Sequence, residues 1–174
     1  KTGTLTRNEL KVVDVLPIGT QQDGSIRDML AAYTANLSHQ NKMAAAIAEY
    51  VGKTDRALPA KTHEIPFNSA RKWSAVVLPE TTLVLGAPER VLSPDHDWQA
   101  IARATELSKA GQRVLAVACC AVAPQDNQLD EKRQGLALVV MSDQVRENIR
   151  ETLDTFYDQG VELKVISGDN METV

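Results

Sequence analysis

The sequence predicts an α/β (α+β-like) protein in which helices flank an antiparallel sheet and a partial parallel β-α-β unit follows. Short apolar strands in hairpin-like pairs occupy the middle of the chain, with amphipathic helices before and after them, which is typical of an antiparallel sheet covered by helices. From Leu136 on, a strand, a helix and a strand follow one another, which is typical of a parallel crossover. This change predicts a domain boundary between residues 135 and 136, and a second seam is expected after residue 8.

The first third of the chain is expected to form one strand and two helices. Residues 9–16 alternate loosely between apolar and polar side chains, and Pro17 ends this strand. Residues 26–37 have apolar side chains at helical spacing. Residues 41–51 are rich in alanine and lead into Gly52, so a second helix is expected there.

The middle of the chain is expected to form hairpins. Residues 61–67 and 72–78 predict two paired strands, and a third strand at 81–85 follows a turn. A short helical turn is expected at 88–92. Residues 98–110 form a clear amphipathic pattern that places Trp98 on the apolar side. The remaining expected elements are strands at 114–122, 136–141 and 161–166 and a helix at 145–157.

Composition limits the classes of function. The net charge of −4 over 174 residues argues against a nucleic-acid partner, and no apolar run is long enough for a membrane helix, so no direct membrane contact is expected. Cys119 and Cys120 are neighbours in an expected strand and should point to opposite faces, which disfavours a disulfide between them. They are expected to be reduced, and no zinc site is expected.

Two short runs near the ends of the chain have the composition of phosphate-binding loops. Residues 1–6 read KTGTLT, and residues 167–170 read SGDN after an expected strand. Serine and threonine hydroxyls, with the backbone N–H groups around glycine, bind phosphate oxygens or hydrated cations. Each run alone is more typical of an ordinary turn, so the argument depends on the pair.

Together the two runs resemble the P-type (E1-E2) cation-transporting ATPases. In that family a phosphorylated aspartate comes immediately before Lys-Thr-Gly-Thr, and a Thr-Gly-Asp loop follows a long insertion. The resemblance implies that the nucleophile would precede Lys1 and that the Thr2 backbone binds Mg²⁺ in the full-length protein. The matching residues are Lys1, Thr2, Gly3 and Thr4 in the phosphorylation-site loop, and Ser167, Gly168 and Asp169 in the second loop, where serine keeps the hydroxyl.

Residues 142–146 resemble the Asp-Pro-Pro-Arg hinge of the same family, with Asp143 and Arg146 kept and both prolines lost. The resemblance implies that this segment contacts the nucleotide where the chain re-enters the phosphorylation domain. Ser142 or Asp143 is also a typical helix N-cap, and the two interpretations are compatible. Without the prolines the hinge is expected to be less rigid.

The segment 65–74 brings an aromatic ring close to two cations, which suits adenine stacking and attraction of a triphosphate. The alternative is a hairpin with Phe67 in the core and a solvated basic turn. The segment resembles the adenine site of P-type ATPases, which implies that Phe67 stacks on adenine and that Lys72 lies along the nucleotide. Trp73 is expected to pack in the core.

Two more motifs complete the implied nucleotide site. Gly86 and Ala87 lie in a Leu-Gly-Ala-Pro-Glu run that resembles the family's Lys-Gly-Ala-Pro-Glu, and they are expected to let the backbone approach the ligand closely. Arg113 lies in a Gly-x-Arg-x-Leu-Ala run and is implied to reach the phosphates. Leu85 replaces the usual lysine, and Asn41 lies in a helix start where the family often has an acidic residue. Modest ATP affinity is therefore expected.

Six motifs in the family's order imply the nucleotide-binding domain of a P-type cation pump, most similar to the compact bacterial ones. The implied parts are 1–8, a stub of the phosphorylation domain; 9–135, the nucleotide-binding domain; and 136–174, part of the phosphorylation domain. The implied ligands are ATP and Mg²⁺. The implied partners are the remaining phosphorylation, actuator and transmembrane domains of the same pump, at the cytoplasmic face of the cell membrane. Because the nucleophile would precede residue 1, the chain is expected to bind nucleotide without turnover.

Two alternatives stay open. One is a fragment of a haloacid-dehalogenase-type phosphatase, which needs an Asp-x-Asp nucleophile loop that this chain is not expected to contain. The other is a non-enzymatic interaction module with a degenerate pocket, which Leu85 favours. A degenerate module would bind no nucleotide, whereas a phosphatase relative would turn over small phosphate esters. The transported ion is not encoded here, since ion selectivity belongs to membrane helices.

Overall fold

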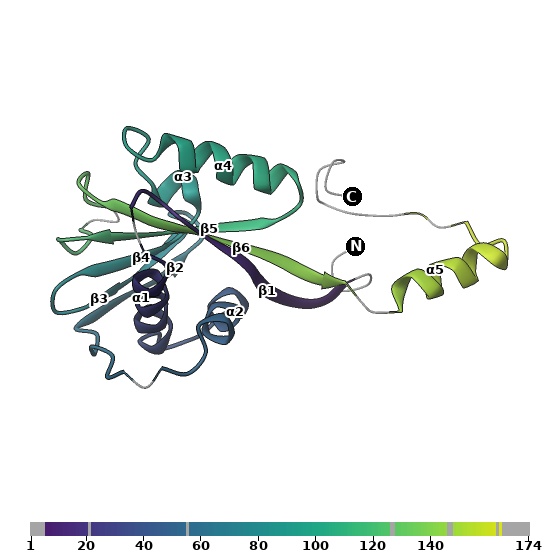
Figure 1. Cartoon of the computed structure of the whole chain (residues 1–174), viewed down its shortest axis with the longest axis horizontal. Helices are drawn as coiled ribbons and strands as arrows, with labels where there is room; N and C mark the ends of the chain where they lie inside the picture. The colour runs from purple at the N-terminus through teal and green to yellow at the C-terminus, as the bar shows by residue number, and fades with distance from the viewer. Residues whose placement is uncertain are drawn as a thin grey trace.

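The computed structural model describes residues 6–20, 22–54, 56–125, 128–145, 148–162 and 164. A six-stranded sheet has the strand order β1-β6-β5-β4-β3-β2, and all neighbouring strands are antiparallel (Figure 1). The strands are β1 (Thr6–Pro17), β2 (His63–Asn68), β3 (Trp73–Val77), β4 (Thr82–Gly86), β5 (Arg113–Cys120) and β6 (Gln134–Val145). The helices are α1 (Asp23–Ala35), α2 (Lys42–Val51), α3 (Pro88–Val91), α4 (Trp98–Lys109) and α5 (Ile149–Asp158).

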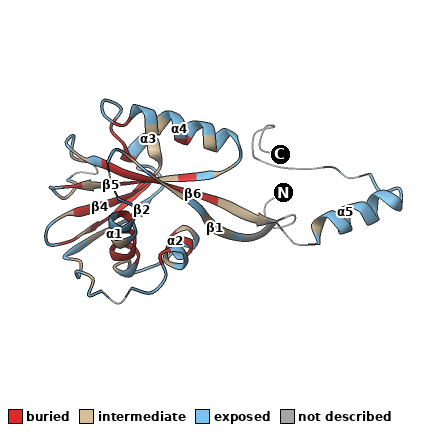
Figure 2. Ribbon diagram, viewed as in Figure 1, coloured by how far each residue is buried: buried red, intermediate tan, exposed pale blue. Residues whose placement is uncertain are grey.

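Helices cover both faces of the sheet, so strand alternation sends successive side chains into two separate cores. α1 and α2 lie on one face, and α3 and α4 lie on the other (Figure 1). Buried residues concentrate in the sheet and on the helix sides that face it (Figure 2). The α1–α2 core includes Ile26, Leu30, Tyr33, Ile47, Leu83, Leu85, Val117 and Val139. The α3–α4 core includes Trp73, Val84, Val91, Ala104, Ala116, Cys120 and Leu138.

Several predictions about single residues are decided by this two-sided packing. Trp73 is buried in the α3–α4 core, as expected. The two cysteines are free, and they pack toward opposite faces of β5, as expected. Burial raises the pKa of the Cys120 thiol to about 11. The placement of Trp98 on a core-facing side of α4 is wrong, because its side chain is 62% exposed at the start of the helix.

The expected parallel crossover from Leu136 to Ile166 does not match the structure. Its first strand is part of β6, which lies between β1 and β5 and is antiparallel to both. A boundary between residues 135 and 136 would cut through this central strand, whose residues 136–141 are all buried. The helix of the crossover is present as α5, whereas most of the expected second strand lies outside the described residues.

The segment after β6 begins its helix later than expected. Ser142 and Asp143 belong to β6, and the N-cap residue of α5 is Asn148, so a cap at Ser142 or Asp143 is wrong. α5 extends away from the sheet in Figure 1 and buries none of its residues. Across the described part of the chain, no helix combines the length and apolar character needed to cross a bilayer.

β3 and β4 approach each other very closely at Gly86. A Cβ atom at this position would lie 2.4 Å from the carbonyl oxygen of Lys72 and 2.5 Å from Cβ of Trp73. Lys72 has a left-handed backbone with φ of 61°, which is uncommon for a residue other than glycine. Its N–H donates to Asn68 O (2.7 Å), and its carbonyl accepts from Ala87 N (3.0 Å). These two bonds hold the β2–β3 turn against the start of α3.

We expect Gly86→Ala to lower the free energy of unfolding by roughly 2 kcal/mol or more, because the added methyl group overlaps the backbone of the neighbouring strand. Urea denaturation followed by circular dichroism measures this change. Gly24→Ala is the matched control, because nothing lies within 4 Å of its added Cβ in the first turn of α1. There alanine should be neutral or stabilise by about 0.5–1 kcal/mol. Equal stability of the two variants would contradict the contact at Gly86.

Candidate functional site

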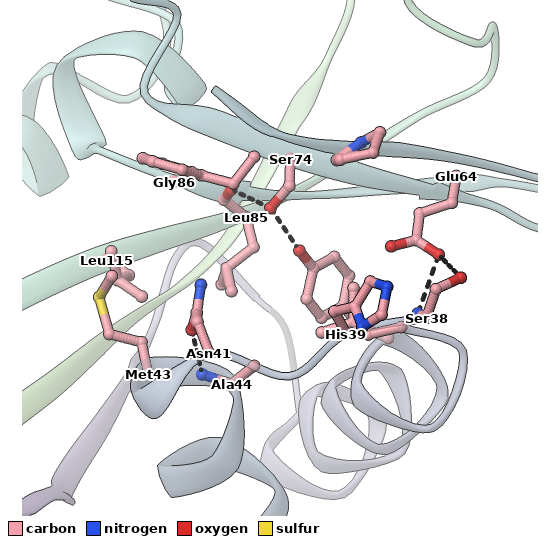
Figure 3. Close-up of a pocket in the computed structure, with 14 residues that line it drawn as sticks. Ser38, His39, Asn41, Met43, Ala44, Glu64, Ser74, Leu85, Gly86 and Leu115 are labelled. Atoms are coloured by element: carbon pink, nitrogen blue, oxygen red, sulfur yellow. Dashed lines mark hydrogen bonds between the residues drawn. The ribbon is translucent and has the colours of Figure 1, made fainter. Parts of the chain in front are cut away.

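A pocket of about 390 Å³ lies on the α1–α2 face of the sheet, next to the segment that joins the two helices (Figure 3). Its volume is in the range of pockets that hold small molecules. The lining residues come from both helices, the connecting segment and strands β2 to β5. They are Tyr33, Leu37, Ser38, His39, Asn41, Met43, Ala44, Glu64, Pro66, Phe67, Ser74, Leu85, Gly86 and Leu115.

A buried hydrogen bond joins α1 to β3 at the base of the pocket. The hydroxyls of Tyr33 and Ser74 lie 2.7 Å apart, and both residues are buried. Burial raises the pKa of Tyr33 to about 12; the hydrogen bond with Ser74 opposes this rise and the charge of Glu64 adds to it. Tyr33 therefore stays protonated at neutral pH, and its position relative to the sheet is defined by one polar contact.

Glu64 of β2 is held at one end of the pocket by the segment between α1 and α2. Its Oε2 accepts hydrogen bonds from Ser38 N (3.0 Å) and Ser38 Oγ (2.7 Å), and it also pairs with Lys61 Nζ. Burial tends to raise the pKa of Glu64, but the bonds from Lys61 and Ser38 outweigh it and hold the pKa below its usual range. The carboxylate is therefore ionised at neutral pH.

Three of the sequence-predicted residues meet at the other end of the pocket. Phe67 is 49% exposed and lines the pocket, so the alternative with its ring in the core is wrong. Gly86 also lines the pocket. A side chain at this position would overlap the neighbouring strand β3, so glycine is needed there whether or not a ligand binds. Lys72 lies beside Gly86 on the β2–β3 turn, and its Nζ is 3.2 Å from Glu89 Oε1.

Ala87 and Glu89 belong to the start of α3. Ala87 is the N-cap residue of this short helix, and it does not line the pocket. Burial tends to raise the pKa of Glu89, but a backbone hydrogen bond and the charges of Lys72 and Arg90 outweigh burial and hold the pKa below its usual range. An ionised Glu89 thus competes with any phosphate for Lys72.

Arg113 and Asp143 are brought together by the neighbouring strands β5 and β6. A guanidinium nitrogen of Arg113 lies 4.0 Å from Asp143 Oδ2. Arg113 is two residues before Leu115, which lines the pocket, so its side chain starts on the same face of the sheet. Both residues lie outside the pocket lining, at the end of the sheet that also holds Gly86.

Of the other predicted site residues, Asn41 lines the pocket, and its Oδ1 caps α2 by accepting from Ala44 N (2.9 Å). Within the described residues, no group of three or more His, Cys, Asp or Glu side chains could hold a metal ion. The remaining predicted residues lie outside the described part of the chain: Lys1, Thr2, Gly3, Thr4, Arg146, Ser167, Gly168 and Asp169.

The charge distribution separates the pocket into two ends. The described lining residues include no lysine or arginine, and Glu64 is the one acidic residue among them. Glu64 of β2 is paired with Val76 of β3, and Gly86 of β4 is paired with Trp73 of β3. Glu64 therefore lies three positions from the Gly86 row, on the side toward the end of β3. Arg113 lies three positions before Ala116, the partner of Gly86 on β5. The carboxylate and the guanidinium therefore lie on opposite sides of the Gly86 row.

Sequence reasoning missed the polar residues that shape the pocket: Tyr33, Ser38, His39, Glu64 and Ser74. Ser74 carried a weak signal, because it is a polar residue inside the apolar run of β3, where a buried hydroxyl needs a partner. Glu64 carried none, since a glutamate in an edge strand is ordinarily solvated. Its link to Ser38 joins residues 26 positions apart.

Comparisons with known proteins identify relatives over the whole chain. It is 38% identical over 184 residues to the probable cation-transporting ATPase exp7 of Streptococcus pneumoniae, and 38% identical over 176 residues to the calcium-transporting ATPase CtpE of Mycobacterium bovis. Both alignments cover 100% of this chain and 22% of the relative, so the chain spans about a fifth of the proteins it matches. No model of a protein family matches the chain.

Solved structures show the same fold. The crystal structure of a zinc-transporting PIB-type ATPase in the E2.Pi state superposes with a TM-score of 0.70 at 20% identity, over 99% of this chain and 25% of that chain. A crystal structure of a zinc-transporting PIB-type ATPase in a second state superposes with a TM-score of 0.67 at 19% identity, again over 99% of this chain and 25% of that one. The expected antiparallel sheet flanked by helices is thereby confirmed as a P-type ATPase domain fold.

We expect Tyr33→Phe and Ser74→Ala each to lower the free energy of unfolding by about 1 kcal/mol. Each substitution removes one hydroxyl of the pair and leaves the other buried hydroxyl without this hydrogen bond. A double-mutant cycle by urea denaturation should give a coupling energy of about 1 kcal/mol between the two sites. Tyr157→Phe is the control, since that side chain is exposed on α5. Strictly additive effects of the two core variants would show that the hydrogen bond contributes nothing.

Proposed function

We propose that this chain, a homologue of one segment of the bacterial cation-transporting ATPases with a P-type ATPase fold, is the nucleotide-binding domain of a cation pump. The observation that carries the proposal is the pocket itself: it is largely apolar, it has the exposed ring of Phe67 at its rim, and Lys72 lies just outside it. A flat, uncharged base suits such a lining, and its phosphates suit the cations beyond it.

The two ends of the pocket give the bound nucleotide a direction. The base lies between Phe67 and the apolar wall formed by Leu85 and Leu115. The phosphates pass the Gly86 row and point toward Lys72 and Arg113, because the carboxylate at the opposite end repels them. Leu85 leaves the pocket floor without a cation, which supports modest affinity.

Mg²⁺ arrives with the nucleotide in this proposal. The described residues offer no cluster of acidic or imidazole ligands, and magnesium commonly keeps several waters while it binds substrate phosphates. In this proposal the chain therefore holds the ion through the nucleotide's phosphates, which Lys72 and Arg113 attract. Thr2, the residue expected to bind the ion through its backbone in the full-length protein, lies outside the described residues. When bound, the ion neutralises phosphate charge.

In a full-length pump the domain would present Mg-ATP to an aspartate preceding Lys1. The long antiparallel pair β1–β6 joins the two ends of the domain, since Thr6 lies opposite Val145. We place the domain boundary there, after β6. Residues from Asn148 on, together with residues 1–5, belong to a phosphorylation domain in this proposal, and the actuator and transmembrane domains complete the pump, with this domain at the cytoplasmic face of the membrane.

The pocket should bind nucleotide, whereas hydrolysis through an aspartyl-phosphate would also need the carboxylate nucleophile that the motifs imply before Lys1. An Asp-x-Asp sequence does occur, at Asp95 and Asp97, contrary to expectation. It lies in the loop before α4, on the sheet face opposite the pocket, where the buried Asp97 carboxylate accepts from Ser93 N (3.0 Å). Asp97 therefore has a structural role in that loop, which disfavours the phosphatase alternative.

The degenerate interaction module remains the second candidate, and Leu85 in the lining favours it. A titration with ATP observed by two-dimensional amide NMR decides between the two. Saturable shifts at Phe67, Lys72, Gly86 and Arg113 support the nucleotide-binding domain. No shift up to millimolar ATP would support the degenerate module, and turnover of small phosphate esters would support a phosphatase.

We expect Phe67→Ala to weaken ATP binding about tenfold, because stacking of a base on an aromatic ring contributes roughly 1–3 kcal/mol. Isothermal titration calorimetry of the wild type and variant measures the change. The chain has two phenylalanines, and Phe156→Ala is the matched control, since Phe156 on α5 is 42% exposed and distant from the pocket. Equal losses in both variants would exclude a specific role for the Phe67 ring.

We expect Glu89→Gln to tighten ATP binding about two- to fivefold, since it releases Lys72 from an exposed ion pair of roughly 0.2–1 kcal/mol and removes a negative charge near the phosphates. The effect should shrink as salt concentration rises. Glu106→Gln is the control: Glu106 forms a similar exposed pair with Arg103 (3.1 Å) on α4, behind the sheet. Unchanged or weaker binding by Glu89→Gln would contradict competition for Lys72.

A further inference from the structure

We propose that a second pocket, on the α3–α4 face of the sheet, binds a free α-amino acid with an apolar side chain. This pocket, called the α4 pocket below, has a volume of about 500 Å³ and lies between the end of β1, the first turns of α4 and the start of β6. The sheet separates it from the pocket described above, which lies on the face covered by α1 and α2 (Figure 1). The inference therefore goes beyond the proposed function and does not depend on it.

A buried carboxylate presents one oxygen to the α4 pocket. Asp97 lines the pocket and is only 8% exposed. Its Oδ2 accepts a hydrogen bond from Ser93 N, whereas the described residues give Oδ1 no hydrogen-bond donor. In the described part of the chain, no fully buried side-chain oxygen lacks a partner, so Oδ1 has access to the open space beside it. Asp97 thus offers the pocket an acceptor that the fold itself does not use.

Gly135 of β6 makes room for this carboxylate. A Cβ atom at position 135 would lie 2.9 Å from Asp97 Oδ2 and 3.0 Å from Oδ1, so a side chain there would displace the carboxylate. The backbone of β6 and the N–H group of Ser93 together hold Asp97 in one orientation. The acceptor is therefore preorganised for a ligand.

The carboxylate selects the group that a ligand brings to it. A carboxylate accepts hydrogen bonds and donates none, so the ligand must present a donor to Asp97 Oδ1. An ammonium group suits this position best, because it also offsets a buried negative charge that is costly to leave unpaired. A metal ion is not supported, since no group of three or more His, Cys, Asp or Glu side chains in the described residues could hold one.

The start of α4 suits an anionic group beside that ammonium. Gln99 and Ala100 line the pocket, and their backbone N–H groups find no hydrogen-bond acceptor among the described residues. The side chain of Asp97, the N-cap residue, does not cap the helix. Unpaired N–H groups and the helix dipole favour a negative group at this place. A ligand that carries an ammonium and a carboxylate on one carbon matches an acceptor and donors that are neighbours in the chain.

The other polar residues of the lining agree with a zwitterion. Arg103 adds a positive charge, and its exposed ion pair with Glu106 is weak, so the guanidinium is able to turn to a ligand carboxylate. The lining also contains His96, Gln99 and Gln134. Neutral imidazole and amide side chains both donate and accept hydrogen bonds, so they tolerate either charged group of the ligand.

Another wall of the α4 pocket is apolar. Leu16 and Ile18, at the end of β1, line the pocket together with Leu138 of β6, and all three pack in the α3–α4 core. A branched aliphatic side chain gains free energy when it is buried against such a wall. An apolar α-amino acid such as leucine therefore matches the acceptor, the donors and the wall at once.

The test is a titration of the whole chain with L-leucine, observed by two-dimensional amide NMR without nucleotide. We expect saturable shifts with a millimolar dissociation constant at Asp97, Gln99 and Gly135, and no shift at Phe67 on the opposite face. Two fragments of the ligand are the chemical controls: isoamylamine lacks the carboxylate, and isocaproate lacks the ammonium group. Each should bind about tenfold more weakly than L-leucine, because each leaves one charged group of the ligand out of the site.

Two variants assign the charged groups. Asp97→Asn keeps the shape of the side chain and an acceptor for Ser93 N, and it should weaken L-leucine binding about tenfold. Asp95→Asn is the matched control, because Asp95 is an exposed neighbour that does not line the pocket. Arg103→Gln should weaken L-leucine binding about two- to fivefold and leave the weak binding of isoamylamine unchanged.

The absence of shifts with millimolar L-leucine would overturn the inference. Binding of isoamylamine as tight as that of L-leucine would also overturn it, because the pocket would then be a general cation site. So would wild-type affinity in Asp97→Asn, or an equal loss in Asp95→Asn. If circular dichroism shows that Asp97→Asn does not fold, the three ligands compared on the wild type and on Arg103→Gln decide. None of these outcomes affects the proposal for the nucleotide pocket.

Discussion

The contact between Gly86 and the backbone of Lys72 and Trp73 determines how the site is built. Trp73 and Ser74 are neighbours in β3, so strand alternation sends Trp73 into the α3–α4 core while Ser74 faces α1 on the other side of the sheet. Beside this contact, Lys72 has a left-handed conformation, and its carbonyl accepts a hydrogen bond from Ala87 N. The turn with Lys72 and the start of α3 are thus joined by a backbone hydrogen bond, next to the strand end that carries Phe67.

The second property of the site is its polarity. The α1–α2 connection reaches across to β2, and the Ser38–Glu64–Lys61 cluster holds an ionised carboxylate at one end of a largely apolar pocket. The cations lie beyond the Gly86 row, where each already has an acidic neighbour, Glu89 or Asp143. In the proposed function, the phosphates of a nucleotide would replace these neighbours, so binding would gain less from the cations than their number suggests. Such an exchange would favour binding of modest affinity.

The sequence singled out candidate residues that belong to short motifs, and it missed pocket residues whose position depends on contacts between distant parts of the chain. The resemblance to known motifs singled out Phe67 and Gly86, which line the pocket, and Lys72, which lies beside Gly86. It also singled out Arg113 and Asp143, which lie on adjacent strands. Glu64 and Ser38 were missed, because their contact joins positions 26 residues apart and neither has an unusual local pattern. The roles of all these residues in nucleotide binding stay predictions.

The sequence by itself determined the order of the helices and strands, the antiparallel hairpins and the family of the fold, because these depend on local periodicity and on short motifs. Only the tertiary structure decided that residues 136–141 join the antiparallel sheet between β1 and β5, since a buried apolar strand has the same pattern in parallel and antiparallel sheets. It also decided that Trp98 is exposed and that Glu64 points into a pocket. Both depend on which surfaces meet across the sheet, and that information is spread over the whole chain.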